Sequence, residues 1–360
     1  MKLLLLAGEE SGAIYAQRIR EQLLANDPGV EIRGYQDYGF EIADLAVIGF
    51  WAVLKKAFYF LRVKRTMERA IVEWRPDVVC TVDYPGMNLK LAAFAKKRQI
   101  RAVHVVCPQV WAWKKGRIPK IEAALDKLCC FFPFEPSFFR EGFAEFVGHP
   151  LVDEFRGLAA GVNDKGKTLA ILPGSRLGEI SAHMPVLVKV MEKISSVMPI
   201  KVVIPAANDK AYAAISSVIS SALLKQAAVS VIRGGARELL CHADAAIVAS
   251  GTATLEAAIA NCPTVLVYKV NWLFAAIMRR LIKGVRHLGL ANIIAEKAGR
   301  ECPMPECIQE DFTVENVLKY LRPYLEDEAA NERKRAELKS SVALLGSGED
   351  AISRIVRCLK

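Results

Sequence analysis

The sequence lacks several patterns by which common protein classes are recognised. Its nine cysteines include no Cys-x-x-Cys pair, and the chain contains no Gly-x-Gly-x-x-Gly. His, Cys and carboxylate residues nowhere have metal-ligand spacing, and no segment reaches the roughly 18 uninterrupted apolar residues of a membrane span. Sequence repeats and low-complexity tracts are also missing. These absences weigh against dinucleotide-dependent enzymes and membrane-spanning proteins, and we predict neither a metal nor a cofactor.

The cysteines do not suggest a disulfide scaffold. Several of them lie in apolar runs, where a thiol behaves as a small core residue. A chain of 360 residues is also larger than the small secreted domains that depend on disulfides. A signal peptide is not expected, because the apolar start is short and the polar residues 8–12 follow it at once. A reducing cytoplasm fits the cysteines best, and we interpret residues 2–7 as a first buried strand.

The bulk composition is that of a folded protein with a basic surface. The chain is 52% hydrophobic and 24% charged, and its length suits two domains of ordinary size. Its formal net charge is +10 and its isoelectric point is about 9.1. Nucleic acid, an anionic membrane surface and anionic substrates are the usual partners of such a charge. A basic surface without a partner is the alternative at this point.

Short apolar runs alternate with helical patterns along the whole chain. We predict strands at residues 2–7, 78–82, 102–107, 127–131, 168–172, 201–204, 245–249 and 264–268, and helices at 13–25, 64–74, 89–97, 179–197 and 254–260. This alternation predicts an α/β fold with two doubly wound, Rossmann-like parallel sheets. The pattern restarts after the polar stretch 160–167, so we expect an N-terminal domain at 1–163 and a C-terminal domain at 164–340. The helical segment 341–360 is expected to pack back toward the N-terminal domain.

Two loops in the second half have the residues of a phosphate site. The segment 172–176, Leu-Pro-Gly-Ser-Arg, follows a strand, so its turn exposes backbone N–H groups and Arg176 can add a bidentate contact. The segment 250–256, Ser-Gly-Thr-Ala-Thr-Leu-Glu, also opens a helix after a strand. In it the glycine allows close approach, Thr252 can cap the helix, and Glu256 can accept hydrogen bonds from ribose hydroxyls. An ordinary turn and plain helix capping are the alternatives. Together the loops predict a nucleotide-diphosphate site, and neither resembles a Walker P-loop.

These loops belong to a longer set of motifs. The set comprises Gly8-Glu9 with Ser11-Gly12, Asp83-x-Pro85-x-x-Asn88, Val110-Trp111-Ala112-Trp113, Pro133-Phe134-Glu135, Val147-Gly148-His149-Pro150, the two phosphate loops, Asn292, and Pro305-Glu306-Cys307-Ile308-Gln309. In this combination the chain resembles the lipid-A-disaccharide synthases, inverting glycosyltransferases of the two-domain GT-B type. The resemblance implies that UDP-2,3-diacylglucosamine and 2,3-diacylglucosamine 1-phosphate (lipid X) are joined into a β-1,6-linked disaccharide of lipid A biosynthesis, with release of UDP. Both substrates are anionic lipids, which accounts for the positive charge.

The resemblance also implies which residues carry the reaction. An inverting transfer needs a base, and Asp83, at the end of the strand 78–82, matches the essential Asp of the family. The expected acceptor-side residues are Glu9, Ser11, Gly12, Asn88 and His149. The expected UDP-binding residues are Arg176, Ser250, Gly251, Thr252, Glu256, Asn292, Glu306 and Gln309. The residues alone leave structural roles open: turn or helix capping for Asp83 and Asn88, a simple first loop for Glu9, and a hinge for His149. Two tryptophans, Trp111 and Trp113, are expected to pack a loop rather than to touch substrate.

The chain departs from the family pattern at four places. Ala13 and Gly86 stand where the family has carboxylates. The family's Gly-Pro-x-Met stretch is shortened at residues 34–37, and the segment 292–309 is a few residues longer than usual. The first two changes remove carboxylates beside the expected acceptor site, so they concern the identity of the acceptor or the rate of turnover. They do not concern the UDP site.

Two segments combine bulky apolar residues with basic ones. In 271–287 the apolar residues share one helix face and the basic residues the other, which fits an interfacial helix or a core-packed helix with a basic outer face. In 51–65 apolar residues lie on nearly every side, which favours contact with lipid tails or a partner; a buried crossover helix is the alternative. These segments and the acylated substrates predict a peripheral protein on the anionic cytoplasmic face of the inner membrane. A homodimer is left open.

Two other functions remain as alternatives. One is another GT-B-like enzyme of UDP-N-acetylglucosamine, such as an epimerase or a different glycosyltransferase. The other is a non-catalytic relative that binds nucleotide sugars or lipids. A nucleic-acid partner is not expected, because the basic residues lie among apolar ones and no nucleic-acid-binding motif is present.

Overall fold

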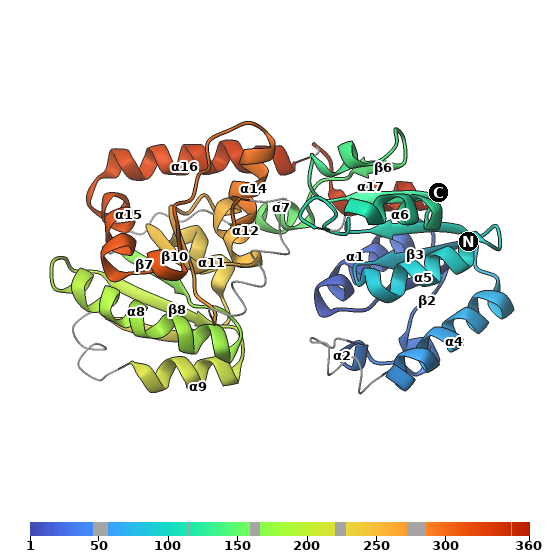
Figure 1. The fold of residues 1–360 in the computed structure, drawn as a ribbon, viewed down its shortest axis with the longest axis horizontal. Helices are drawn as coiled ribbons and strands as arrows, with labels where there is room; N and C mark the ends of the chain where they lie inside the picture. Colours follow the sequence, from blue (N-terminus) through green and yellow to red (C-terminus); the bar gives the residue numbers. More distant parts are fainter. Residues whose placement is uncertain (46–56, 114, 159–165, 220–227, 272–285, 347) are drawn as a thin grey trace. The chain divides into compact units, whose positions relative to one another are not determined.

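The chain divides into two compact units (Figure 1). The computed structural model describes residues 1–45, 57–113, 115–158, 166–219, 228–271, 286–346 and 348–360. The first unit consists of residues 1–150 and 345–360, and the second of residues 151–344. The division thus falls at residue 150, whereas the sequence suggested residue 163, and the first unit takes in the C-terminal residues.

The first unit is built on a six-stranded parallel sheet. Its strands are β1 (Lys2–Ala7), β2 (Glu31–Arg33), β3 (Val78–Val82), β4 (Arg101–Val105), β5 (Lys127–Cys130) and β6 (Ala144–Phe146), in the order β2-β1-β3-β4-β5-β6. Its helices are α1 (Glu10–Asn26), α2 (Ile42–Leu45), α4 (Ala57–Trp74), α5 (Pro85–Lys96), α6 (Ile118–Ala124) and α17 (Ala351–Leu359), with short 3₁₀ turns η1 (Gln36–Tyr38), η2 (Lys115–Arg117) and η3 (Glu135–Phe138). The chain builds outward from β1 to β2 and then returns to β3, so the strand order reverses between β1 and β3.

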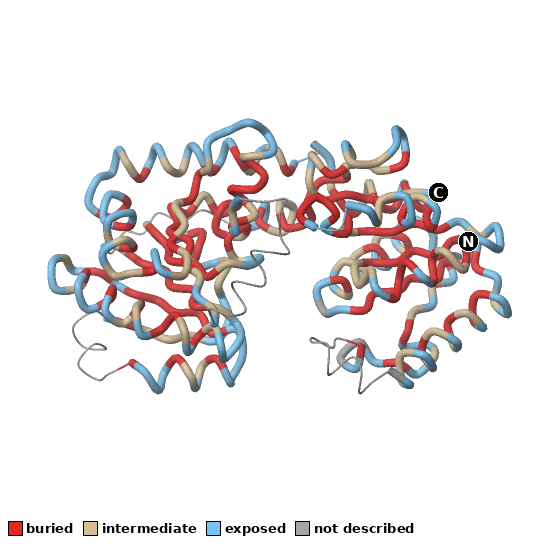
Figure 2. The backbone as a smooth tube through the Cα atoms, viewed as in Figure 1, coloured by how far each residue is buried: buried red, intermediate tan, exposed pale blue. Residues whose placement is uncertain are grey.

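Helices cover both faces of this sheet, which explains the apolar start of the chain. Leu3 and Leu5 pack with α1 and α17, whereas Leu4 and Leu6 pack with α4 and α5. A strand covered on both faces needs apolar residues at every position. Figure 2 shows the central strands buried. Because α17 contributes to the same core as α1, the last residues of the chain are part of the first unit.

The second unit is also built on a six-stranded parallel sheet, but with a different strand order. Its strands are β7 (Thr168–Leu172), β8 (Lys201–Ala206), β9 (Val229–Arg233), β10 (Ala245–Ala249), β11 (Thr264–Tyr268) and β12 (Glu306–Ile308), in the order β12-β11-β10-β7-β8-β9. Its helices are α7 (Pro150–Phe155, which begins at the division), α8 (Leu177–Ser195), α9 (Asp209–Val218), α11 (Ala236–His242), α12 (Thr252–Ile259), α14 (Leu290–Lys297), α15 (Val314–Glu326) and α16 (Glu328–Val342), with 3₁₀ turns η4 (Gln309–Asp311) and η5 (Ala343–Leu345). Helices α8, α9 and α15 pack on one face of the sheet. Here the strand order reverses between β7 and β10.

The predicted α/β fold is confirmed, and the eight predicted strands are present as β1, β3, β4, β5, β7, β8, β10 and β11. Four strands, β2, β6, β9 and β12, escaped prediction, and they are the outer strands of the two sheets. All five predicted helices begin earlier than predicted: α1 at Glu10, α4 at Ala57, α5 at Pro85, α8 at Leu177 and α12 at Thr252.

The two segments predicted to meet a membrane lie partly outside the described residues. Residues 272–285 are not described, so the helix predicted at 271–287 is not tested, and the same holds for 51–56. Within α4, Val63 is fully buried, whereas Phe58 is 87% exposed and Leu61 is 49% exposed. In the described part of the chain, none of the helices has both the length and the apolar character to cross a membrane.

Candidate active site

Four predicted site residues meet where the strand order of the first sheet reverses. Glu9, Ser11 and Gly12 follow the carboxyl end of β1, and Asp83 follows the carboxyl end of β3. In open α/β sheets the loops at such a switch point form the ligand site. Glu9 is the N-cap residue of α1, and Ser11 is exposed in the first turn of that helix. The fold therefore gathers these residues at the position where a ligand is expected.

Glycines allow the loop after β1 to approach the loop after β3. A Cβ atom at Gly8 would lie only 2.4 Å from the ring of Tyr84, and one at Gly12 would lie 3.2 Å from the carbonyl oxygen of Val82. A side chain at residue 8 would therefore push the two loops apart. The glycines of this motif have a steric role, which is to let the neighbouring carboxyl groups come together.

The carboxyl groups in question belong to Glu9 and Asp83. Burial raises the pKa of Glu9, and the negative charge of Asp83 raises it further. Burial also raises the pKa of Asp83 above its usual range, although a hydrogen bond from the Tyr84 backbone N–H to Asp83 Oδ1 (2.8 Å) opposes the shift. A carboxylate whose pKa is raised is a stronger base, so Asp83 has the property that a general base needs.

The backbone at Asp83 is held in an uncommon conformation. Asp83 and Tyr84 have φ angles of 51° and 50°, in the left-handed region. Such conformations are costly for residues other than glycine and occur where surrounding contacts enforce them, often at functional sites. One such contact is the hydrogen bond from the Asp83 N–H to the carbonyl oxygen of Val105, at 2.9 Å.

Asn88 supplies the other contacts that hold this loop. Its side chain is fully buried, and its Nδ2 donates to the carbonyl oxygens of Asp83 (2.8 Å), Val82 (3.2 Å) and Leu6 (3.2 Å). Its Oδ1 accepts a hydrogen bond from the Tyr35 hydroxyl at 2.8 Å. The sequence predicted contact with the acceptor, but the structure places Asn88 beneath the site, where it positions the loop of Asp83.

The loops after β4 and β5 are joined by aromatic and acidic side chains. Trp111 is buried and donates its indole N–H to Glu135 Oε1 at 3.1 Å. Its ring meets the rings of Phe132 and Phe134 edge to face, with centroids 6.4 and 5.4 Å apart. Trp111 therefore packs, as predicted, whereas Trp113 is 41% exposed.

His149 lies in a buried position at the end of the first unit. Its ring packs against those of Phe131 and Phe132, with centroids 5.2 and 5.6 Å apart. Burial lowers the pKa of His149 to about 4, so the ring is neutral at physiological pH. The backbone N–H of His149 donates to the carbonyl oxygen of Leu345 at 3.1 Å, which ties the two chain segments of this unit together. These contacts hold the ring in the core, and the predicted role of His149 on the acceptor side stays a prediction.

The second unit contains a pocket at its own switch point. The pocket has a volume of about 360 Å³ and lies at the carboxyl ends of β7, β8, β9 and β10. Five of the eight predicted UDP-binding residues line it: Arg176, Ser250, Gly251, Thr252 and Glu256. The two loops that the sequence marked for phosphate therefore form one cavity.

Two helix N-termini face this pocket without side-chain caps. Arg176 is the N-cap residue of α8 and Gly251 that of α12, and neither helix has a side-chain cap. Thr252 was expected to cap α12, but it is the first helical residue and is exposed. Gly251 has φ of 150°, which disfavours any other residue. Uncapped N-terminal N–H groups and the helix dipole are the features that bind phosphate.

Three acidic side chains near the pocket are paired with arginines. Arg176 is 69% exposed at its side chain and contacts Glu179 at 2.9 Å. Arg237 donates to Glu256 Oε1 at 2.8 Å and also pairs with Glu154 at 2.5 Å. Because Arg176 is exposed, it can leave Glu179 for a phosphate at little cost, whereas Glu256 is oriented by Arg237.

Asn292 and Glu306 lie beside the pocket rather than in its lining. Glu306 accepts hydrogen bonds from the backbone N–H groups of Leu288 (3.1 Å) and Gly289 (3.0 Å) and from Asn292 Nδ2 (2.8 Å). Ser250 in turn donates its hydroxyl to the Leu288 carbonyl oxygen at 3.3 Å. These contacts anchor the segment that leads into α14.

Gln309, the remaining predicted UDP residue, follows β12. Its Oε1 accepts a long hydrogen bond, 3.4 Å, from the backbone N–H of Val270. Its own backbone has a φ of 55°, in the left-handed region. Like Asn292 and Glu306, Gln309 is not part of the pocket lining.

Two supporting residues of the pocket were missed from the sequence, Arg237 and His183. The buried ring of His183 contacts the Pro173 carbonyl oxygen through Nδ1 (2.7 Å) and accepts from the Lys269 backbone N–H through Nε2 (2.9 Å). Burial lowers the pKa of His183, and the neutral ring has the donor and acceptor that these contacts need. His183 thus fixes the phosphate loop to the end of β11.

The sequence of residues 161–168 also matches the P-loop pattern Gly-x-x-x-x-Gly-Lys-Thr. The threonine of a P-loop opens a helix after a strand. Thr168 is instead the first residue of strand β7, so the match has no P-loop context.

Solved structures identify the fold class. The chain is similar to MurG of Acinetobacter baumannii, with a TM-score of 0.62 and 14% identity over 99% of both chains. It is also similar to a putative UDP-N-acetylglucosamine 2-epimerase from Listeria monocytogenes, with a TM-score of 0.66 and 13% identity over 99% of this chain and 94% of that one. Likeness at such low identity establishes the fold, which is the GT-B fold.

Sequence comparison places the chain within this class. Residues 3–353 match the family model described as lipid-A-disaccharide synthetase. The lipid-A-disaccharide synthase of Syntrophus aciditrophicus (strain SB) is 32% identical over 381 residues, covering 99% of this chain and 98% of the relative. That of Anaeromyxobacter sp. (strain K) is 34% identical over 365 residues, covering 96% and 93%. The chain therefore belongs to the lipid-A-disaccharide synthase family of glycosyltransferases.

Proposed function

We propose that this chain transfers the sugar of UDP-2,3-diacylglucosamine to 2,3-diacylglucosamine 1-phosphate. The products are a β-1,6-linked disaccharide 1-phosphate and UDP. Family membership supports the reaction. The observation that carries the assignment of the donor is the 360 Å³ pocket, where two uncapped helix N-termini meet Arg176 and Glu256.

The carboxyl groups of the first unit are proposed to provide the base. In an inverting transfer the acceptor hydroxyl attacks the anomeric carbon while a base removes its proton and UDP departs. Asp83 is proposed as that base, because burial raises its pKa and its loop is held by Asn88. Glu9 is close enough to influence Asp83 electrostatically and is proposed to bind the acceptor. A positioned general base contributes roughly 10²–10⁴-fold to a rate.

The pocket of the second unit is proposed to bind UDP. The N-termini of α8 and α12 would face the diphosphate, and Arg176 would stabilise the negative charge that develops as UDP leaves. Glu256 would accept hydrogen bonds from the ribose hydroxyls, with Arg237 fixing its orientation. Asn292 and Glu306 would act from beside the pocket, by holding the segment to which Ser250 is hydrogen-bonded, and Gln309 would act through its contact with Val270.

The protein is also proposed to bind the anionic cytoplasmic face of the inner membrane. On α4, Phe58 and Leu61 are exposed next to the exposed cations Arg62 and Arg65. Exposed apolar side chains flanked by basic residues are typical of helices that lie in a lipid interface. Such a surface would bring the protein to the membrane in which its acylated substrates lie.

A direct assay tests the reaction. Purified full-length protein is incubated with UDP-2,3-diacylglucosamine and 2,3-diacylglucosamine 1-phosphate, and the products are identified by mass spectrometry. The proposal expects disaccharide 1-phosphate and UDP in equal amounts. Formation of UDP without disaccharide, or epimerisation of UDP-N-acetylglucosamine with no transfer, would overturn it.

A further inference from the structure

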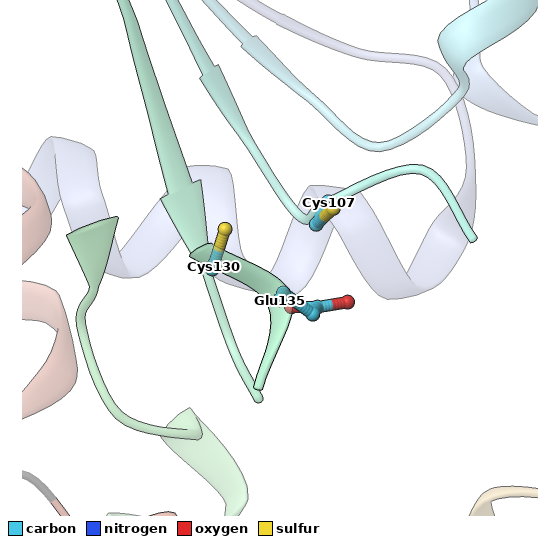
Figure 3. A group of neighbouring side chains, drawn as sticks. All are labelled: Cys107, Cys130 and Glu135. Carbon is cyan, nitrogen blue, oxygen red and sulfur yellow. The ribbon is translucent and has the colours of Figure 1, made fainter. Parts of the chain in front are cut away.

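Three potential metal ligands come together in the first unit, and none of them belongs to the carboxyl pair. Figure 3 shows Cys107, Cys130 and Glu135 with their side chains gathered at the carboxyl ends of β4 and β5. One ligand atom from each lies within 4.8 Å of the other two, and all three residues are buried. The sequence predicted no metal site, because these residues are not spaced as a motif. The fold brings the three residues together from the ends of strands β4 and β5 and from the 3₁₀ turn η3.

The distances suit a four-coordinate metal ion after a small contraction. With metal–sulfur bonds of about 2.3 Å and metal–oxygen bonds of about 2.0–2.2 Å, the ligands of a tetrahedral zinc ion lie roughly 3.3–3.8 Å apart. Three protein ligands would leave one position for a water molecule. Two thiolates favour a thiophilic ion of the zinc type over the hard ions Mg²⁺ and Ca²⁺.

Glu135 is held in place by neighbouring hydrogen-bond donors. Glu135 is 2% exposed and accepts hydrogen bonds from the Trp111 indole N–H and the Phe132 backbone N–H, both at 3.1 Å. In the described part of the chain, no Lys, Arg or His side chain forms an ion pair with it. These two hydrogen bonds fix the carboxyl group beside the two thiols.

We propose that Cys107, Cys130 and Glu135 bind one thiophilic divalent cation, such as Zn²⁺. Binding exchanges the two thiol protons, and the carboxyl proton where present, for the metal ion, and the protons pass to solvent. The ion clamps the loop after β4, which carries Trp111, to the turn after β5. It serves the structure of these loops and takes no part in the transfer step.

Strand β5 provides a matched control. Cys129 and Cys130 are adjacent and both fully buried, but they point to opposite faces of the sheet. Cys129 packs in the core with α1 and α17, whereas Cys130 packs in the core with α5 and α6. Replacing either by alanine removes one buried thiol from the same strand, yet only Cys130 belongs to the proposed site.

Cobalt titration tests the proposal. Reduced, metal-stripped full-length protein is titrated with Co²⁺ and followed by the near-ultraviolet thiolate-to-cobalt absorption. We expect one ion per chain, displaced by Zn²⁺, with the band retained in Cys129→Ala and lost in Cys130→Ala. Glu135→Gln keeps the size of the side chain and its acceptor oxygen. It should weaken binding by more than the roughly 10–100-fold that loss of an outer partner costs.

Two further readouts guard against misinterpretation. Cys302 contacts His287 at 3.2 Å and is another place where Co²⁺ could bind, so the band must persist in Cys302→Ala. At the same concentration, Zn²⁺ should raise the unfolding temperature of the wild-type and Cys129→Ala proteins more than that of Glu135→Gln. Absence of a thiolate band in the wild type, or its persistence in folded Cys130→Ala, would overturn the proposal.

Discussion

The two parallel sheets of this protein each reverse their strand order once, and they differ in the chemistry at that point. Between β1 and β3 the first sheet presents two carboxyl groups, Glu9 and Asp83, whose pKa values are raised. Between β7 and β10 the second sheet presents two uncapped helix N-termini and Arg176. The fold sets where a ligand can bind, and the few residues after each strand decide whether that place suits a base or a diphosphate.

The largest expected effect concerns the base. Asp83→Asn keeps the size and hydrogen-bonding atoms of the side chain but removes its basicity, so turnover should fall about 10²–10⁴-fold. The matched control is Asp77→Asn, at the opposite end of the same strand, where the carboxylate accepts a hydrogen bond from the Lys2 N–H at 2.7 Å. Steady-state kinetics on both variants is the measurement. More than a tenth of wild-type turnover in Asp83→Asn would contradict the assignment.

The second effect concerns the diphosphate pocket. Arg176→Ala or Glu256→Ala should each remove a charge-assisted contact worth about 1.5–3 kcal/mol, which weakens UDP binding roughly 10–150-fold. Arg322→Ala serves as the control, because Arg322 is exposed on α15 and pairs with Glu326 in the next turn of the same helix. Calorimetric titration with UDP gives the affinities. Unchanged affinity in both pocket variants would place the UDP site elsewhere.

The third effect concerns membrane binding, which we assign to helix α4 of the first unit. Burying a Phe or Leu side chain is worth about 1.5–3 kcal/mol, so the double variant Phe58→Ser, Leu61→Ser should bind anionic vesicles at least ~10-fold more weakly. Val72→Ser is the control, because Val72 is 48% exposed farther along α4. Vesicle sedimentation is combined with circular dichroism to show that each variant is folded. If wild-type protein ignores anionic vesicles at low salt, the surface has another role.

The smallest effect is a shift in pH dependence. Asp83 must be ionised to act as a base, so turnover should fall as the pH drops through its pKa. Because burial raises that pKa, the acidic limb should lie above the usual range of an aspartate. A pH–rate profile at saturating substrates measures this limb. A profile that stays flat down to pH 4 would mean that the limiting group is not a buried carboxylate.

The same contrast between regions explains what the sequence could predict of the fold. The eight predicted strands have a neighbouring strand on both sides and are largely buried, so most of their positions are apolar, as in Leu3 to Leu6. The four strands that escaped prediction are sheet edges. Their sequences, such as Glu-Ile-Arg in β2 and Glu-Cys-Ile in β12, are short and half exposed, so no apolar run marks them.

Within the site, the sequence predicted residues that follow strands and missed residues that act across the fold. Asp83, Arg176 and Gly251 lie in the loops that follow strands, where short motifs reveal them. Arg237 and His183 lie on helices and contact Glu154 and Lys269, which are 83 and 86 residues away along the chain. Such pairings depend on tertiary structure, and a single sequence carries no signal for them.

The central claim is that the first switch point provides the base and the second binds UDP. The UDP affinity of Asp83→Asn tests this claim most directly. The account predicts that this variant, although nearly inactive in transfer, binds UDP within about twofold of the wild type, because Asp83 stabilises no part of the nucleotide pocket. Calorimetric titration of wild type, Asp83→Asn and Arg176→Ala under identical conditions provides the comparison. If Asp83→Asn loses UDP affinity as strongly as Arg176→Ala does, the two switch points do not have separate roles and the account is wrong.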